Sequence, residues 1–316
     1  MRDITLNQND GGQRLDKFIS KTLCKMPQSM LYKSIRKGRV RVNGKKVTDG
    51  KFMLSVGDTL SLYINDEFFE TEPTRFDFLT APANIDIVYE DENILLVNKA
   101  PALAVHDFEG SSTDTLINRI IHYLYNKKEY LPENENSFEP ALCNRIDRNT
   151  CGIVIAAKNA QALREMNELI KEHKVEKKYL ALCHGAPKKG SGELKFFLKK
   201  LSDKNLVLVS EKPLPEHKTA ITLYKVLKKT SEFSLLELTL KTGRTHQIRA
   251  SLSHIGCAIV GDGKYGKSFA SDSKLGFPYQ ALCSYFVKFN FEDAETLKYL
   301  NGKSFSVSDI WFKDKI

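Results

Sequence analysis

The spacing of apolar residues near the amino terminus predicts two short helices. Apolar residues recur there at helical intervals: Leu15, Phe18, Ile19, Leu23, Leu31 and Ile35. In the stretch "RVRVNGKK", Arg39 and Arg41 alternate with valines before an Asn43-Gly44 turn, which predicts a β-hairpin with both arginines on its solvent face. Residues 1–66 are therefore expected to form a small αα-β domain.

A second pattern begins after residues 67–83, an acidic stretch with two prolines and no periodicity that is typical of a linker. Strands are predicted at 85–100 (two strands around an acidic turn), 152–158, 177–185, 187–218 (a basic hairpin), 219–227 and 234–242. Helices are predicted at 113–128 and 159–174, the second opened by Asn159 as a cap. Residues 84–316 are therefore expected to form an α+β domain, a mixed, mostly antiparallel sheet with flanking helices.

Charge is unevenly distributed along the chain. The net charge is +9 and the isoelectric point is about 9.0, an excess that favours phosphate-rich partners. A compact basic patch is expected on the small domain: Lys33, Arg36, Lys37, Arg39, Arg41, Lys45 and Lys46. A solvated surface would also look like this, but few acids lie among these residues, and we favour contact with RNA or DNA.

Other classes of protein are disfavoured by the sequence. No apolar run approaches the ~18 residues of a membrane span, and no signal peptide is indicated, so we expect a cytoplasmic protein, a monomer without membrane contact. The six cysteines lack paired or finger spacing, so we expect buried thiols rather than a zinc site or disulfides. Because there is also no glycine-rich phosphate loop, neither a metal nor a nucleotide cofactor is predicted.

The stretch "CNRIDRNTCGIVIAAK" (143–158) places Asp147 between Arg145 and Arg148, immediately before an apolar strand. Nearby positive charge favours the ionised form of a carboxylate. Such a group suits a nucleophile or a base, but it suits an ordinary salt bridge equally well.

A second candidate is "TGRTHQIRASLSHIGCAIVGDGKYG", which predicts a helix with three basic or potentially basic residues in its first turns: Arg244, His246 and Arg249. Arg249 is expected to point away from the apolar face of this helix. The amino-terminal end of a helix disfavours positive charge, so an anion should offset these side chains. A phosphate, a carboxylate from elsewhere in the chain, or glutamates screened by water would each serve.

Four segments together resemble the RluA-type pseudouridine synthases. "NRIDRNTCG" is similar to the H-R-L-D-x-x-T-S-G signature of that family, "YEDENILLVNKAPALAVH" to its first motif, "EKKYLAL" to its tyrosine motif, and "GRTHQIRASLSHIGCAIVGDGKYG" to its last conserved block. The order and spacing agree over residues 84–290. Residues 1–66 resemble the RNA-binding module first described in ribosomal small-subunit protein four.

The resemblance implies that the chain isomerises uridine in RNA without a cofactor, and large-subunit ribosomal RNA is the expected target. By the same resemblance, Asp147 is the catalytic aspartate, Tyr179 stacks on the target base, Arg249 pairs with the aspartate, and Arg145 handles the displaced nucleotide. The carboxylate either attacks the sugar or removes a proton from it, and the sequence leaves both routes open. Two alternatives also stay open, a transfer or messenger RNA target and a catalytically silent RNA-binding or ribosome-assembly protein.

Three positions depart from the family pattern. Asn144 stands where the family has histidine, Cys151 where it has serine, and Cys283 where histidine is expected. Because Asn144 and Cys151 lie beside the aspartate in the sequence, these departures put substrate handling in question rather than the type of reaction.

Overall fold

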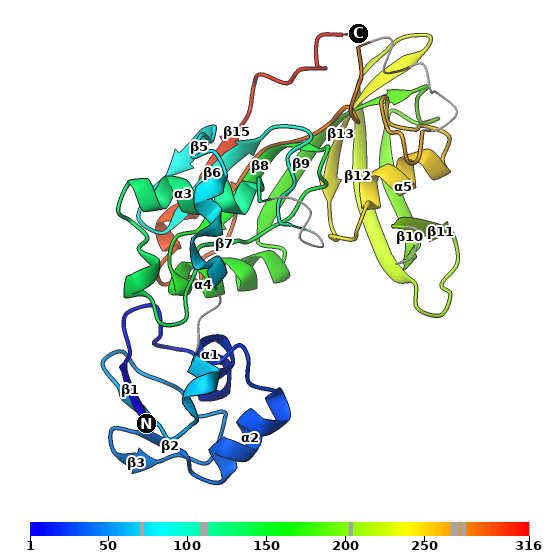
Figure 1. Cartoon of the computed structure of the whole chain (residues 1–316). Coiled ribbons are helices and arrows are strands. Elements are labelled where there is room, and N and C mark those ends of the chain that lie inside the picture. Colours follow the sequence, from blue (N-terminus) through cyan, green and yellow to red (C-terminus); the bar gives the residue numbers. More distant parts are fainter. Residues whose placement is uncertain (70–72, 108–112, 202–204, 267–271, 273–275, 316) are drawn as a thin grey trace.

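The chain forms a small amino-terminal part joined to a much larger one, as the computed structural model in Figure 1 shows. The structure describes residues 1–69, 73–107, 113–201, 205–266, 272 and 276–315. None of the helices within these ranges is long and apolar enough to span a bilayer.

The small part is a four-stranded antiparallel sheet, in the order β1-β4-β2-β3, with two helices packed against it. Its elements are β1 (Arg2–Thr5), α1 (Leu15–Thr22), α2 (Gln28–Arg36), β2 (Val40–Val42), β3 (Lys45–Lys46) and β4 (Thr59–Leu62). The helices bury the residues expected from their spacing, and Phe18 and Leu15 are fully buried. The spacing does not predict β1, because Ile4 is the only aliphatic residue of this strand.

Every basic residue of the predicted patch is exposed on this part of the chain. The hairpin turn forms at Asn43 and Gly44, whose φ angles of 49° and 76° suit the asparagine and glycine found there. Arg41 also lies 5.1 Å from the ring centre of Tyr63, an exposed aromatic. The patch therefore combines positive charge with an accessible ring.

The large part is built on an eleven-stranded sheet. Its strands are β5 (Ile87–Glu90), β6 (Ile94–Lys99), β7 (Ala141–Leu142), β8 (Cys151–Ala157), β9 (Val175–His184), β10 (Ser191–Leu201), β11 (Leu206–Ser210), β12 (Lys218–Lys229), β13 (Phe233–Leu240), β14 (Leu282–Phe289) and β15 (Ser304–Ser306). The main order is β11-β10-β12-β13-β9-β14-β8-β6-β5, and only β14 and β8 pair in parallel among the described strands. The predicted α+β class, with a mixed and mostly antiparallel sheet, is confirmed.

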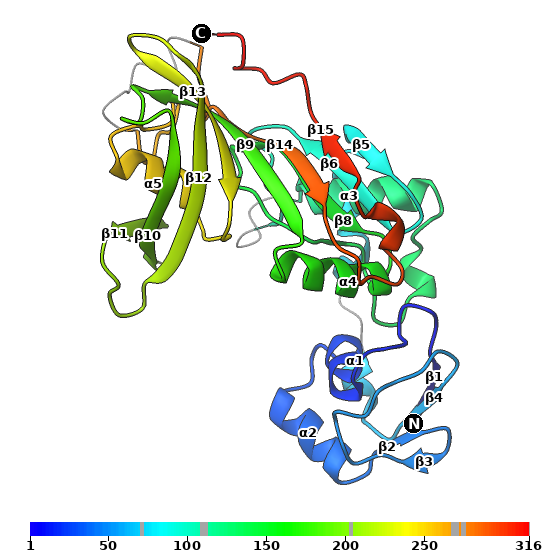
Figure 2. The same cartoon turned by 180° about the vertical axis from the view of Figure 1, so that it is seen from behind.

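Helices α3 (Leu116–Asn126) and α4 (Ala160–Lys171) cover opposite faces of one half of this sheet (Figures 1 and 2). Alternate residues of β6 face opposite ways, so that Leu95 packs in the cluster containing α3 and Ile94 in the cluster containing α4. Asn159 caps α4 as predicted, because its side chain accepts a hydrogen bond from Ala162 N. Both faces of this half are buried, which explains the uninterrupted apolar run in β8.

The other half of the sheet, β10 to β13, carries helix α5 (Gln247–His254), which packs near β10 and β11. The two halves meet where β14 runs beside both β9 and β8. Gly152 is required at this junction, since a Cβ atom there would lie 2.2 Å from the backbone oxygen of Ser284. Its φ angle of 106° is also one that side chains rarely permit.

The predicted linker contains more structure than its composition indicates. Two short 3-10 helices, Asp66–Phe69 and Pro73–Thr80, occupy much of this stretch. Two further 3-10 helices, Pro132–Asn134 and Lys298–Leu300, lie elsewhere in the large part. Phe69 packs in the core of the small part and Phe78 in the core of the large part, which explains two of the aromatic residues in this acidic stretch. Residues 70–72 of the predicted linker lie outside the described residues. The domain limits at 66 and 84 stay a prediction.

One cysteine departs from expectation. Five of the six are buried, but Cys24, just after α1, is exposed. The preceding residue, Leu23, is fully buried at the end of this helix, and Cys24 points to solvent. The expectation of six buried thiols was wrong at this position.

Polar side chains connect the two parts besides the chain itself. Asp10, which is fully buried, accepts hydrogen bonds from Asn136 Nδ2 at 2.7 Å and from Ser137 Oγ at 2.6 Å. Asn9 donates to Glu135 at 2.7 Å and accepts from the backbone N–H of Ala160 at 2.9 Å. The amino-terminal loop therefore docks against the loop after α3 and the start of α4.

Candidate active site

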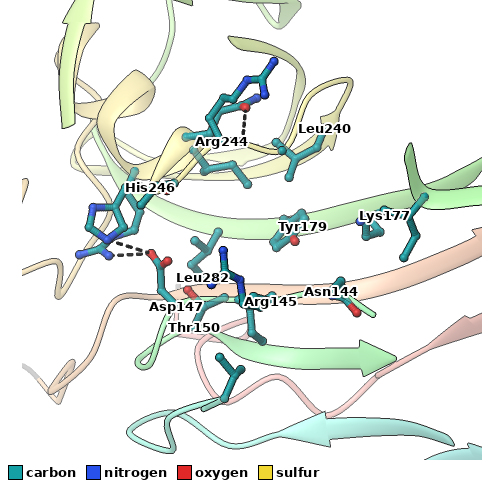
Figure 3. Close-up of a pocket in the computed structure, with 18 of the residues that line it drawn as sticks. Asn144, Arg145, Asp147, Thr150, Lys177, Tyr179, Leu240, Arg244, His246 and Leu282 are labelled. Carbon is teal, nitrogen blue, oxygen red and sulfur yellow. Dashed lines mark hydrogen bonds and ion pairs between the residues drawn. The ribbon is translucent and has the colours of Figure 1, made fainter. Parts of the chain in front are cut away.

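A pocket of about 460 Å³ lies in the large part, and the six residues singled out there by sequence all line it. They are Arg145, Asp147, Tyr179, Arg244, His246 and Arg249. Figure 3 shows Asp147 and His246 at one end of the pocket, Lys177 and Asn144 at the other, and Arg145 and Tyr179 between them. The segments that carry these residues are far apart in sequence, so the fold creates the pocket.

Asp147 stands in a turn immediately before β8. The turn closes through a hydrogen bond of 3.0 Å from Thr150 N to the carbonyl oxygen of Asp147. The hydroxyl of Thr150 accepts from Gln280 Nε2 at 2.8 Å, which ties the turn to the segment before β14. The side chain of Asp147 stays 27% exposed, so its carboxylate is held but accessible from the pocket.

Lys99, at the end of β6, fixes the same turn from beneath. Its ammonium donates to the carbonyl oxygens of Ala100 and Leu103 at 2.8 Å each and of Arg148 at 2.7 Å. Burial lowers the pKa of Lys99 to about 7, while three acceptors need the three N–H groups of the protonated form. Lys99 thus joins the first motif to the aspartate turn.

The carboxylate of Asp147 accepts one hydrogen bond, 2.7 Å long, from Nη1 of Arg249. The other donors of the guanidinium, Nε and Nη2, each bond to Asp262 at 2.8 Å. Burial opposes ionisation of Asp262, but its bonds with Arg249 outweigh this and lower its pKa below the usual value. Arg249 therefore lies between two carboxylates.

Arg249 contacts Asp147 through one hydrogen bond only. The fork is used by Asp262, which the sequence reading did not single out, and Asp147 receives a single prong. Among the three anions considered for the helix start, a carboxylate from elsewhere in the chain is the one found at Arg249. Residues 247–252 of helix α5 are all buried, and Arg249 lines the pocket with 8% of its side chain exposed.

The two arginines that flank Asp147 in sequence do not hold its carboxylate. Arg148 turns away, and its Nε donates to the carbonyl oxygen of Ala102 at 2.9 Å. Arg145 is exposed and lines the pocket. The positive charge that contacts the carboxylate of Asp147 comes from Arg249, 102 residues further along the chain, and not from these two sequence neighbours.

Tyr179, in β9, forms part of the pocket wall and is 6% exposed. Burial raises the pKa of its phenol to about 12. The hydroxyl is therefore protonated near neutral pH, and it is able to donate a proton or a hydrogen bond but not to act as a preformed base.

His246 precedes α5 and adopts a left-handed backbone conformation, with φ 50° and ψ 22°. Its Nδ1 atom lies 2.9 Å from the hydroxyl of Tyr265, which already accepts from Val207 N at 2.9 Å. We assign the phenolic proton to the bond with Nδ1, which leaves the proton of a neutral ring on Nε2, 4.0 Å from Asp147. Burial lowers the pKa of His246 and favours this neutral form.

The start of α5 is fixed by Gln247 rather than by a charged cap. Its amide donates to Ile221 O and Thr222 Oγ1 and accepts from Arg244 N and Thr242 Oγ1. The sequence pattern placed Arg244 and His246 in the first turns of this helix. The helix begins at Gln247, so both residues precede it.

The three departures from the family pattern fall at two places. Asn144 accepts a hydrogen bond of 2.8 Å from Ile155 N through Oδ1, and so bonds to the backbone of β8. Cys151 and Cys283 are direct neighbours where β8 and β14 run parallel, and the thiol of Cys151 donates to the carbonyl oxygen of Leu282 at 3.6 Å. Both cysteines are buried beneath the turn that carries Asp147.

Several residues of the site were missed by sequence reasoning: Lys99, Lys177, Gln247, Asp262 and Tyr265. Each lies inside one of the motif segments quoted above, and this position within a motif is the sequence signal that could have identified it as a site residue. No cluster of three metal-ligating side chains occurs in the described part of the chain.

The basic patch belongs to the small part of the chain, which stands below the large part in Figure 1. None of Lys33, Arg36, Lys37, Arg39, Arg41 or Lys45 lines the pocket. If these residues bind RNA, they contact a region other than the target nucleotide.

Comparison with known proteins gives matches to both parts of the chain. The profile of a family described as RNA pseudouridylate synthase matches residues 93–254, and the S4 domain profile matches residues 13–60. The uncharacterized RNA pseudouridine synthase YlyB of Bacillus subtilis (strain 168) is 31% identical over 265 residues, which cover 84% of this chain and 82% of that protein.

Ribosomal large subunit pseudouridine synthase C of Buchnera aphidicola subsp. Baizongia pistaciae (strain Bp) is 34% identical over 266 residues, covering 83% of this chain and 80% of that protein. Human RNA Pseudouridylate Synthase Domain Containing 1 has the same fold, with a TM-score of 0.56 at 22% identity over 72% of this chain and 84% of that chain. The chain therefore belongs to the RluA-type RNA pseudouridine synthases, with an amino-terminal S4 RNA-binding domain.

Proposed function

We propose that this enzyme converts specific uridines of large-subunit ribosomal RNA to pseudouridine, with Asp147 as the reacting carboxylate. The contact between Asp147 and Arg249, in a pocket large enough for a nucleotide, carries the assignment of the residue. The names of relatives such as ribosomal large subunit pseudouridine synthase C support the choice of RNA. Transfer or messenger RNA is the second candidate.

The reaction needs a carboxylate near the sugar, and no atoms are lost when the base turns and rejoins through carbon 5. Asp147 either attacks the anomeric carbon or removes the proton of the adjacent carbon, and its partially exposed side chain suits both routes. Arg249 keeps one donor on this carboxylate while Asp262 fixes its plane.

The target nucleotide has to leave its stack to reach Asp147, at a cost of a few kcal/mol. Stacking on the ring of Tyr179 and phosphate contacts offset this cost, since the phenol forms part of the pocket wall. In this proposal Arg145, which is exposed and lines the pocket, contacts the displaced nucleotide. The small part, in the proposed limits 1–66, adds affinity through its basic patch, and the enzyme acts as a cytoplasmic monomer.

Two measurements test this proposal. Pseudouridine mapping of total RNA from cells with and without the gene should show lost sites in large-subunit ribosomal RNA; losses confined to transfer or messenger RNA would favour the second candidate. Asp147→Asn should abolish isomerisation while RNA affinity stays within a few fold, because the two side chains are nearly isosteric. A residual rate above about one thousandth of wild type would exclude Asp147 as the reacting group.

A further inference from the structure

Lys177 differs from the other shielded lysines of the large part because its charge has no partner. It lies in β9, is half-buried, and lines the pocket. Lys99 donates to three carbonyl oxygens, Lys158 pairs with Glu90 and Glu129, and Lys178 pairs with Glu237 at 2.9 Å. No hydrogen bond or ion pair to Lys177 occurs among the described residues.

A shielded, unpaired ammonium is costly, because a charge removed from water needs an opposite charge or several acceptors. Burial indeed lowers the pKa of Lys177. Its neighbours in the pocket wall offer little compensation, since Cys143 and Ile170 are weak or apolar and Asn144 already uses its oxygen for Ile155 N. The missing partner is therefore expected to arrive with a ligand.

The position of Lys177 indicates which part of an RNA it meets. Lys177 and Tyr179 are two residues apart in one strand, so their side chains leave the same face about 7 Å apart. In Figure 3, Lys177 lies beyond Tyr179 as seen from Asp147. If the sugar of the target nucleotide contacts Asp147 and its base contacts Tyr179, the adjoining RNA backbone passes Lys177.

We propose, on the basis of the proposed function, that Lys177 binds a phosphate adjoining the target nucleotide and so completes a subsite at the end of the pocket away from Asp147. A phosphate supplies the full negative charge that the ammonium lacks, and it is present beside every target whatever the sequence. A carbonyl oxygen of the base would supply only a partial charge, and it is treated as an outcome of the test.

The test compares Lys177→Met with Lys178→Met, its neighbour on the opposite face of β9. Each is placed in the Asp147→Asn background, and the dissociation constant is measured on the shortest ribosomal RNA fragment that wild type modifies. Lys177→Met should weaken binding about tenfold and reduce the slope of log K against log salt by about 0.7, as for one lost phosphate contact. Lys178→Met should change neither, and Lys177→Arg should retain most of the affinity.

A methylphosphonate scan of the phosphates beside the target identifies the contact. One neutral linkage should weaken binding by the parent protein but add nothing to Lys177→Met. If no position shows this coupling, or if Lys177→Met behaves like Lys178→Met, the phosphate subsite is excluded, and coupling to changes in the base alone would assign Lys177 to the base instead. The scan with the parent protein needs no lysine variant to fold.

The activity of wild type separates this inference from the proposed function. Wild type that modifies no ribosomal RNA defeats the proposed function itself. If wild type is active but Lys177→Met changes neither the dissociation constant nor the salt slope, only the phosphate subsite is excluded.

Discussion

A single hydrogen bond of 2.7 Å joins Nη1 of Arg249 to Oδ2 of Asp147. Nε and Nη2 of the same guanidinium donate to the carboxylate of Asp262, which is 2% exposed. Asp262 thus fixes the guanidinium of Arg249. The same guanidinium presents one N–H to Asp147, which we propose as the reacting carboxylate.

Arg249→Lys should reduce kcat by about a hundredfold or more, because a single ammonium cannot satisfy Asp262 from two sides and still reach Asp147. Asp262→Asn should cause a smaller loss, of about tenfold, since Arg249 keeps a neutral partner there. Single-turnover rates for both variants and the double variant measure the coupling. Near-normal turnover of Arg249→Lys, in protein with an unchanged melting temperature, would make the arginine merely structural.

The basic patch of the small part gives a prediction about salt. Replacing Lys33, Arg36, Arg39 and Arg41 together with glutamate should weaken RNA binding and reduce the slope of log K against log salt by about 3, since fewer counterions are released. Titrations at several salt concentrations measure this slope.

A charge-conserving exchange at the same four positions, lysine for arginine and the reverse, is the matched control and should keep the slope. Deletion of residues 1–66 is less specific, because it also removes the hydrogen bonds that Asn9 donates to Glu135 and that Asp10 accepts from Asn136. An unchanged affinity and slope after charge reversal would mean that the patch has another role.

Glu90, at the end of β5, gives a prediction about acid stability. Burial alone would raise its pKa, but hydrogen bonds from Lys127, Lys158 and Tyr123 outweigh burial and lower the pKa from 4.5 to about 2. The unfolded chain therefore binds the proton first, and the stabilisation, complete above pH 4.5, is lost as the pH falls from 4.5 to about 2.

Glu90→Gln should reduce the unfolding free energy by about 2 kcal/mol at pH 7, after allowance for partial exposure, and should flatten its dependence on pH between 4.5 and 2. Urea unfolding at a series of pH values measures both effects. Glu168→Gln, in an exposed pair with Lys171, serves as the control and should leave the pH dependence unchanged. An equally steep acid transition in both variants would show that Glu90 is not the responsible group.

Local patterns predicted most elements of the fold but fewer of the contacts within the site. The apolar run of β8 and the cap at Asn159 depend on neighbours in sequence, and both were predicted. β1 pairs with β4 although its four residues include one aliphatic side chain, Ile4, and so carry no apolar alternation. A strand of that kind is visible only once its partner is known.

The same distinction applies to the pocket. Motif resemblance selected Asp147 and Arg249, which the structure brings into contact across 102 residues of sequence. Lys99 looks like any surface lysine, because its three acceptors come from loops that meet only in the folded chain. Arg148 looked like a partner of Asp147 because sequence adjacency gives no side-chain direction.

Asn144 provides the prediction that best separates an active enzyme from a silent RNA-binding protein. If a histidine at this position acted as an acid or base, its replacement would remove a contribution of order 10² to 10⁴ in rate, and this chain would be nearly inert. The side chain of Asn144 instead accepts a hydrogen bond from Ile155 N, and it lies at the end of the pocket away from Asp147 (Figure 3). A ring nitrogen of histidine can accept the same bond, so the position orients the chain and does not transfer protons.

Asn144→His should therefore change kcat/KM by less than about tenfold, or ~1.4 kcal/mol, from an already active wild type. The assay is mass-spectrometric detection of pseudouridine on ribosomal RNA that lacks its natural modifications, with Asp147→Asn as the inactive control. The opposite result would be wild type silent on every cellular RNA and Asn144→His active by orders of magnitude more. In that case the lost histidine was essential, and this chain has kept the fold and the RNA-binding surface while losing the reaction.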